Sequence, residues 1–326
     1  MSDPDHPVTT ALRDLADQAG PPRIRIDDAW RAGRRRRRAA IITPAVAIAA
    51  ALTAGLLTGL PGRGSSYSPA AYALERAARA AAQPGQPVPH PGQYILATSA
   101  GTSMTDTDSG SWLTVERRRI WWPVDARKPG VERYDAVRNE PFPWSGPAPA
   151  RGLGASWLPV PPQGCPGAPP ARFTYQFLAA LPTSPARLRA WIYGHSNGGQ
   201  NAGSQAWTDI TDLLETTLTP PRLTAALLRV AATIPGATVV RHATDAAGRA
   251  GIAVTRRVQG STEDSELVFS ARTYRLLGGR TALTVPEKGV GPPGTVVGGW
   301  ALLNKIVVSH LPRHPQGLGG AASHCR

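Results

Sequence analysis

The chain has 326 residues, of which 41% are hydrophobic and 18% are charged, so it can bury a core and is not disordered throughout. Its 34 Gly and 33 Pro follow no three-residue period, which excludes collagen, and two cysteines are too few for a zinc ribbon or a disulfide-dense scaffold. Basic residues exceed acidic ones by 14, which favours an anionic partner or surface. Composition alone names no reaction.

Residues 1–38 form an Arg-rich tail ahead of an uncharged segment. We expect a weakly ordered cytoplasmic tail, with a docking helix for a cytoplasmic partner as the alternative, because Val8, Leu12 and Leu15 share one helical face. The tail ends in five consecutive arginines, 34–38. Nucleic-acid binding is the competing interpretation of such a run, but its position directly before an apolar segment favours a topological signal and no nucleic-acid partner.

Residues 39–60 carry no charge and, as an α-helix, would extend over roughly 33 Å, which is enough to cross the hydrocarbon core of a bilayer. Seven arginines lie in the fifteen residues before this segment and one lies in the fifteen after it. This asymmetry predicts a single-pass cell-membrane protein with its N-terminus in the cytoplasm and its C-terminus outside. The long leading region favours an uncleaved anchor over a signal peptide.

Small residues repeat every four positions along the predicted span, ending in Gly55 and Gly59. Such a pattern lets two helix backbones approach closely in lipid. The pattern permits a homodimer through Gly55 and Gly59, and a chance pattern in an Ala- and Gly-rich segment is the competing interpretation.

The remainder divides into a linker with a juxtamembrane helix (61–92), an extracytoplasmic domain (93–310) and a flexible C-terminal tail (311–326). Ser68 and Pro69 are typical of a helix start, which predicts a helix over 69–82. In the domain, the pattern predicts strands at 94–98, 112–122 and 131–138. Ten Pro and five Gly in 141–170 predict a loop there.

Three helices are expected next, followed by a run of short strands. The helices are predicted at 185–192, 204–217 and 221–234, and the strands at 237–242, 251–258, 265–270, 274–284 and 294–308. Strands before and after a block of helices indicate the α+β class. We expect one transmembrane helix followed by a curved, half-barrel-like antiparallel sheet with helices packed on one face.

One segment has the spacing of a catalytic motif. Gly194–Gly198 (GHSNG) matches G-x-S-x-G, the turn that presents the nucleophile of α/β-hydrolases between a strand and a helix. A helix-like stretch precedes Ser196 instead of a strand, which favours a polar loop. The histidine partner of a hydrolase would have to be chosen from His242, His310, His314 and His324. The sequence thus predicts no catalytic, cofactor-binding or metal-ligating residue, with a serine hydrolase that uses the GHSNG motif as an alternative.

Two further features stay open from sequence. Cys165 and Cys325 lie on the extracytoplasmic side of the predicted span, where a disulfide is permitted, although either cysteine is equally compatible with a free thiol. Tryptophans concentrate between residues 112 and 157, which indicates core packing or, alternatively, an apolar face for a lipid-like ligand. These tryptophans are Trp112, Trp121, Trp122, Trp144 and Trp157.

Several segments together resemble a family of actinobacterial single-pass membrane proteins. Besides the arginine run, they are Leu181–Pro185, Asp209–Leu214, Leu227–Gly236, Asp245–Arg249, Gly251–Val254 and Gly294–Val297. The overall plan is similar to that of membrane-anchored anti-sigma factors and their extracytoplasmic sensor domains. The resemblance implies an envelope protein and no active-site residues.

We therefore expect a non-enzymatic membrane protein with an extracytoplasmic interaction or sensor domain, including a role in envelope signalling. The expected partners are the bilayer, through residues 39–60, and a protein or lipid-like ligand outside the cell. A tethered lipid- or lipoprotein-binding domain is the alternative, and a membrane-anchored hydrolase is the third interpretation.

Overall fold

The structure is a computed structural model, and it describes residues 68–83, 88–107, 110–143, 145–146, 153–162, 174–195, 201–215, 218–257, 260–313 and 318. All of these belong to the second of the two units into which the chain divides, Arg63–Arg326. Among them, no helix is both long and apolar enough to cross a bilayer. Several predictions lie outside these residues: the tail, the span 39–60 with Gly55 and Gly59, and Trp144, Cys165, Ser196 and Cys325.

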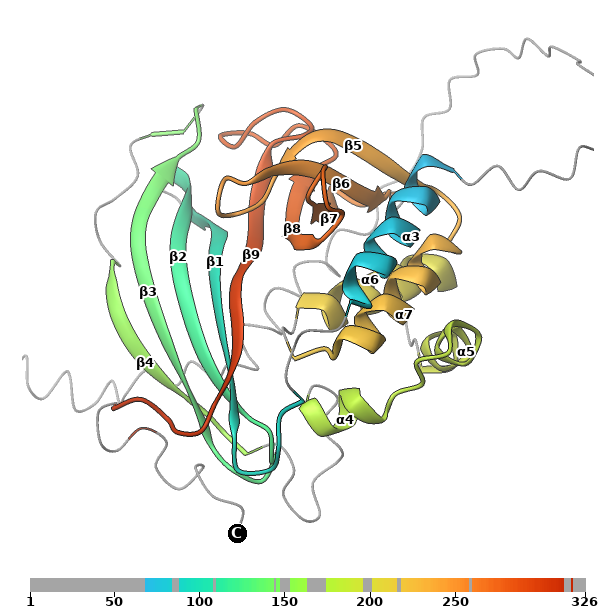
Figure 1. The fold of residues 1–326 in the computed structure, drawn as a ribbon. Helices are drawn as coiled ribbons and strands as arrows, with labels where there is room; N and C mark the ends of the chain where they lie inside the picture. Colours follow the sequence, from blue (N-terminus) through green and yellow to red (C-terminus); the bar gives the residue numbers. More distant parts are fainter. Residues whose placement is uncertain are drawn as a thin grey trace, which may run out of the picture. The chain divides into compact units, whose positions relative to one another are not determined.

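One antiparallel sheet of nine strands dominates the described unit, and its strands bend along their length (Figure 1). The order is β4-β3-β2-β1-β9-β8-β7-β6-β5, so β4 and β5 are the edges of an open sheet. The strands are β1 Tyr94–Thr107, β2 Gly110–Pro123, β3 Gly130–Pro141, β4 Gly154–Val160, β5 Ala237–Thr244, β6 Ala250–Arg256, β7 Glu263–Phe269, β8 Leu276–Leu283 and β9 Val296–Val308. The predicted α+β class with an antiparallel sheet is confirmed.

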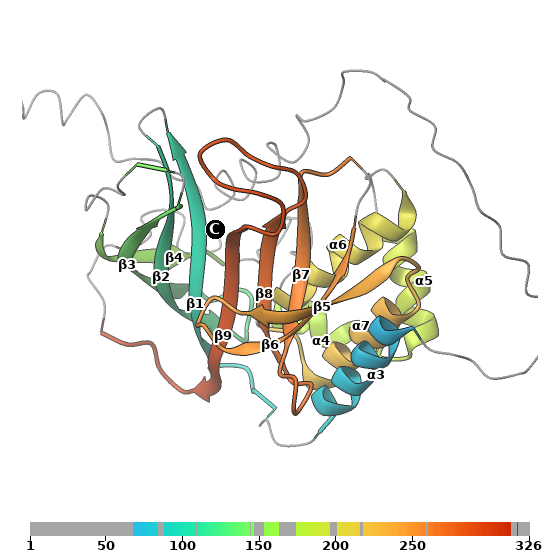
Figure 2. The same ribbon diagram turned by 90° about the horizontal axis from the view of Figure 1, so that it is seen from above.

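The described part of the chain has five helices, which lie on the side of the sheet away from β3 and β4 (Figure 2). They are α3 Pro69–Ala81, α4 Tyr175–Ala180, α5 Pro185–His195, α6 Ala202–Glu215 and α7 Pro221–Ala232. Helix α3 begins as the sequence predicts, because the Ser68 hydroxyl accepts a hydrogen bond from the Ala71 amide at 3.2 Å and Pro69 occupies the first position. It packs against α7 and against β5 and β6.

The two faces of the sheet differ in what covers them. On the helix-side face, Val254, Leu267 and Phe269 pack against apolar side chains of the helices. Because side chains alternate along a strand, the register carries this face to Ile95 of β1 and Trp122 of β2, which join the same core. We call the opposite side the outer face.

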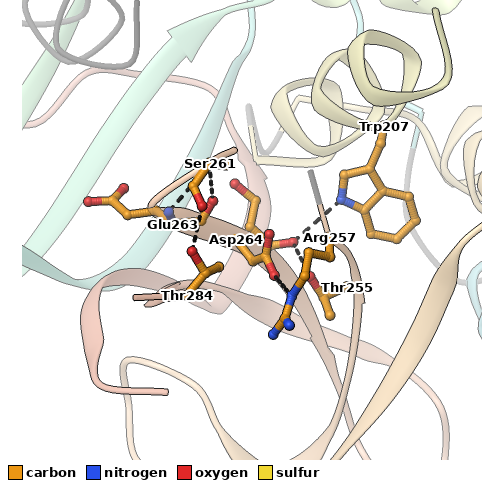
Figure 3. A network of polar contacts seen from close by, with 8 residues as sticks. Trp207, Thr255, Arg257, Ser261, Glu263, Asp264 and Thr284 are labelled. Carbon is orange, nitrogen blue, oxygen red and sulfur yellow. Dashed lines mark hydrogen bonds and ion pairs between the residues drawn. The ribbon is translucent and has the colours of Figure 1, made fainter. Parts of the chain in front are cut away.

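A small polar network ties α6 to the sheet (Figure 3). The buried Trp207 donates its indole N–H to the Ser265 carbonyl oxygen at 3.4 Å, and the Thr255 hydroxyl donates to the same oxygen at 3.2 Å. Beside them, Arg257 pairs with Asp264 at 3.3 Å. The indole therefore buries its apolar rings and keeps its donor satisfied, which fixes the helix against β7.

The prediction of a loop throughout 141–170 is wrong in one part, because β4 lies inside it. Gly154 begins the strand at a φ of +139°, and Pro159 is accommodated because β4 is an edge strand that pairs only with β3. The sequence also missed α4, a helix of six residues capped by Thr174. Both elements are short and depend on their neighbours for stability.

Candidate functional site

A hollow of about 570 Å³ lies where the start of α3 meets β5, β6 and the β7–β8 turn. Its volume is in the range of small-molecule sites. Apolar and aromatic residues form most of its wall, and no acidic side chain lines it. The lining residues are Pro69, Tyr72, Ala73, Val239, Arg241, His242, Gly251, Ile252, Ala271 and Tyr274. We call it the Tyr72–Tyr274 hollow.

Two tyrosines and an arginine form one wall of this hollow. The rings of Tyr72 and Tyr274 meet edge to face, with centroids 6.4 Å apart. The guanidinium of Arg76 lies 5.0 Å from the centre of the Tyr274 ring and donates a hydrogen bond to the Tyr72 hydroxyl at 3.1 Å. These contacts hold the Arg76 cation at the rim of an apolar hollow. Because Arg76 is exposed, part of its side chain stays open to solvent.

The backbone is strained at two positions in the wall. Among the described non-glycine residues, His242 and Tyr274 alone have left-handed φ angles, +58° and +57°. His242 lies in a β-bulge of β5, and the Tyr274 amide closes the β7–β8 turn by donating to the Ser270 carbonyl oxygen at 2.9 Å. Such conformations cost on the order of 1 kcal/mol or more each and concentrate at functional sites. Both occurrences here line one hollow.

The floor requires a glycine. A Cβ atom added to Gly251 would lie 2.1 Å from the carbonyl oxygen of Phe269 on the neighbouring strand. Any side chain at this position would therefore push β6 away from β7. The neighbouring Ile252 and Val239 of β5 also line the hollow.

A second polar group of residues lies on the helix-side face of β2 and β3. Arg118 pairs with the buried Glu132 at 2.6 Å and lies 4.0 Å from Glu116. Burial raises the pKa of Glu116 against the opposing effect of Arg118, and burial together with the neighbouring Glu116 raises the pKa of Tyr134. This part of the sheet is charged, so it does not provide the apolar concave face considered from the tryptophan content.

Lys305 of β9 also points to the helix-side face, since it pairs in register with Ala97. Its ammonium donates to the Thr219 carbonyl oxygen at 3.2 Å, at the connection between α6 and α7. Burial lowers the pKa of this amine to about 8. No ion pair of Lys305 occurs among the described residues, so the amine is held by a neutral acceptor.

The described residues before Ser196 of the GHSNG motif form a helix and not a strand. Helix α5 continues to His195, and α6 begins at Ala202. The imidazole of His195 stacks on Trp191 with centroids 4.7 Å apart, and its Nδ1 lies 2.8 Å from the Trp191 carbonyl oxygen. The helix predicted before Ser196 is therefore confirmed. Of the histidines considered as hydrolase partners, the exposed His242 lies in the Tyr72–Tyr274 hollow.

Three of the described tryptophans of the 112–157 region lie on different faces of the sheet. Trp122 packs against the helix core, whereas Trp121 is buried on the outer face beside Trp157, with ring centroids 5.9 Å apart. These three side chains therefore do not share one face. In the part of the chain that the structure describes, no three His, Cys, Asp or Glu side chains gather as metal ligands would.

No family model and no curated protein matches the chain. Among solved structures it is similar to MucB, crystallised in complex with MucA(peri), at 12% identity over 79% of this chain and 62% of that chain, with a TM-score of 0.24. It is also similar to the LolA superfamily protein NE2245 from Nitrosomonas europaea, at 10% identity over 76% of this chain and 94% of that chain, with a TM-score of 0.18. The chain spans less than two thirds of the MucB chain. With likenesses of this size, the resemblance to the actinobacterial family stays a prediction.

Proposed function

We propose that the chain is a non-enzymatic, single-pass membrane protein whose extracytoplasmic domain is an interaction or sensor domain. We further propose that this domain binds an anionic, lipid-like amphiphile in the Tyr72–Tyr274 hollow. The observation that carries the proposal is the coincidence of an apolar hollow with the two strained non-glycine positions of the described chain.

The chemistry of the wall favours an amphiphile over a fully polar ligand. Val239 and Ile252 supply apolar surface, and covering it with a hydrocarbon chain lowers the free energy of the complex. Arg241 on the wall and Arg76 at the rim supply cations. Because no carboxylate lines the hollow to neutralise them, an anionic head group complements this rim.

A hydrolase is less compatible with the local structure. The nucleophile turn of α/β-hydrolases needs a buried strand before the serine, and α5 occupies that position. A peptide segment of a partner protein is the competing occupant of the hollow, and the experiment separates it from an amphiphile.

The test is calorimetric titration of decanoate into the full-length chain in phosphatidylcholine nanodiscs, corrected with empty nanodiscs. We expect saturable binding that weakens at least tenfold in Arg76→Gln/Arg241→Gln. Decanol, which lacks the charge, should lose little affinity in the same variant. The matched control is Arg187→Gln, because Arg187 is an exposed arginine on α5 outside the hollow.

Three outcomes would overturn the proposal: no saturable binding of decanoate, equal affinity in the double variant and the control, or an equal loss for decanol. Saturable binding of a peptide segment in place of decanoate would assign the hollow to a protein partner.

A further inference from the structure

The outer face of the sheet holds a second hollow, away from the helices. It has a volume of about 350 Å³ and is lined by Thr98, Arg117, Arg119, Asp135 and Val137. Arg117 and Arg119 are two residues apart on β2, so their side chains leave the same face with Cα atoms roughly 6.6 Å apart. Register places Arg117 opposite Asp135 and Thr98 beside Arg119. We call it the Arg117–Arg119 hollow.

The one carboxylate among the lining residues, that of Asp135, already accepts hydrogen bonds from two arginines. Asp135 accepts from Arg119 Nη2 on Oδ2 at 3.2 Å and from Arg133 Nε on Oδ1 at 3.0 Å. Burial alone would raise the pKa of Asp135, but the hydrogen bonds from Arg133 and Arg119 hold it below its ordinary value. Asp135 is therefore ionised at neutral pH, and three guanidinium groups face one negative charge.

Donors remain free after these bonds are made. Arg117 is exposed and forms no ion pair with any described residue. The Nε atom of Arg119 is buried and has no hydrogen-bond partner in the described part of the chain. A buried N–H group without an acceptor is unfavourable. An oxyanion bound beside the Arg119 guanidinium accepts a charge-assisted hydrogen bond from this N–H group.

The backbone shapes the hollow with a bulge. Val115 pairs with Arg138 and Glu116 pairs with Ala136, which leaves Val137 as the extra residue of β3. Val137 is 53% exposed and lies on the rim. Bulges occur often beside functional sites because they redirect side chains, and this one lies one residue pair away from the Arg117–Asp135 pair.

We propose that the Arg117–Arg119 hollow binds a phosphate group. The planar guanidinium matches two phosphate oxygens at once, and two such groups at adjacent same-face positions converge on one tetrahedral anion. The Thr98 hydroxyl is placed to donate a further hydrogen bond. The site is independent of the Tyr72–Tyr274 hollow, since the two share no lining residue. The phosphate comes either from a lipid head group or from a soluble phosphate ester.

The test uses the full-length chain in a phosphate-free, non-ionic detergent, titrated calorimetrically with inorganic phosphate and with glycerol 1-phosphate. We expect saturable binding whose affinity falls at least tenfold in Arg117→Gln/Arg119→Gln. The affinity should fall less in Arg119→Lys, which keeps the positive charge but loses the planar pair of guanidinium donors. Arg187→Gln is the control, and an unchanged far-ultraviolet spectrum with a cooperative melt shows that each variant is folded.

A second arm identifies the source of the phosphate. The chain in phosphatidylcholine nanodiscs is floated with vesicles of phosphatidylcholine containing one third phosphatidylglycerol. Vesicle binding that the double variant loses assigns a lipid head group. Binding of glycerol 1-phosphate without vesicle binding assigns a soluble phosphate ester. Absence of binding in both arms, or equal binding by the double variant and Arg187→Gln, overturns the proposal.

Discussion

Replacement of Lys305 by methionine should stabilise the domain at neutral pH. Burial lowers the pKa of the amine from 10.5 to about 8, so the charged form is disfavoured in the folded chain by roughly 3 kcal/mol. Methionine removes that cost but also removes the donor to the Thr219 carbonyl oxygen at 3.2 Å, which costs about 1 kcal/mol. The net gain expected at pH 7 is about 1–2 kcal/mol.

The same pKa fixes the pH dependence. The pKa of Lys305 is lower in the folded chain than in the unfolded chain, so the unfolded chain binds more protons between about pH 8 and 10.5. The free energy of unfolding of the wild type should therefore rise by about 2 kcal/mol between pH 7 and pH 9.5 through this group. Below pH 8 its unfavourable contribution is nearly constant. Lys305→Met should lack this rise.

The assay is urea unfolding of the full-length chain in non-ionic detergent, followed by tryptophan fluorescence at pH 7 and pH 9.5. Lys288→Met is the matched control, because Lys288 is exposed in the β8–β9 connection. The difference between variant and control cancels other groups that titrate. A destabilised Lys305→Met at pH 7, or an identical pH response in variant and control, would refute the burial argument.

Three further substitutions test strands β5 and β6 and the turn that connects them. Arg249→Ala leaves the Asp245 carboxylate, whose side chain has 0% exposure, without its 2.6 Å ion pair, and should lower the free energy of unfolding by about 3 kcal/mol or more in urea denaturation. Gly251→Ala forces a methyl group to 2.1 Å from the Phe269 carbonyl oxygen and should cost more than about 3 kcal/mol, seen as a lower melting temperature and faster proteolysis. His242→Gly relieves a φ of +58° and should leave the melting temperature unchanged or raise it, while decanoate binding weakens; a loss of stability would show that the strain is not stored there.

Helix α7 illustrates what the sequence predicts well. Pro221 at the first position, an apolar stripe through Leu227 and the Pro235-Gly236 break predict a helix over 221–234, and the structure has a 12-residue helix that ends two residues earlier, at Ala232. Such signals act within the helix itself, so tertiary contacts do not change the outcome that they predict. The strands β5 to β9 were likewise found, with ends displaced by a few residues.

The edge strand β4 and the C-terminal half of β1 were harder to predict from sequence. Strand β1 continues to Thr107 through small and polar residues that have no apolar alternation, because β2 and, as far as Ser103, β9 supply its hydrogen bonds. Strand β4 lies in a proline-rich segment that gives little strand signal. An edge strand tolerates proline, because only its side that faces β3 needs amide donors. In both cases tertiary pairing outweighs local propensity.

The Tyr72–Tyr274 hollow left no signal in the sequence that would have identified it. The two tyrosines are about two hundred residues apart, and tyrosine is not the residue expected at a left-handed φ, where Gly or Asn is usual. The sequence makes His242 a candidate only for the histidine partner of a hydrolase. Its bulge and its neighbours are visible only once β5 is paired with β6.

Photolabelling tests the central claim most directly. The full-length chain in phosphatidylcholine nanodiscs is irradiated with a fatty acid that carries a diazirine in its chain, and the modified peptides are mapped by mass spectrometry. The account predicts labels on segments 69–76, 239–252 and 271–274, which line or adjoin the Tyr72–Tyr274 hollow, and their loss in Arg76→Gln/Arg241→Gln but not in Arg187→Gln. Labels confined to other described segments, or unchanged labelling in the double variant, would contradict it.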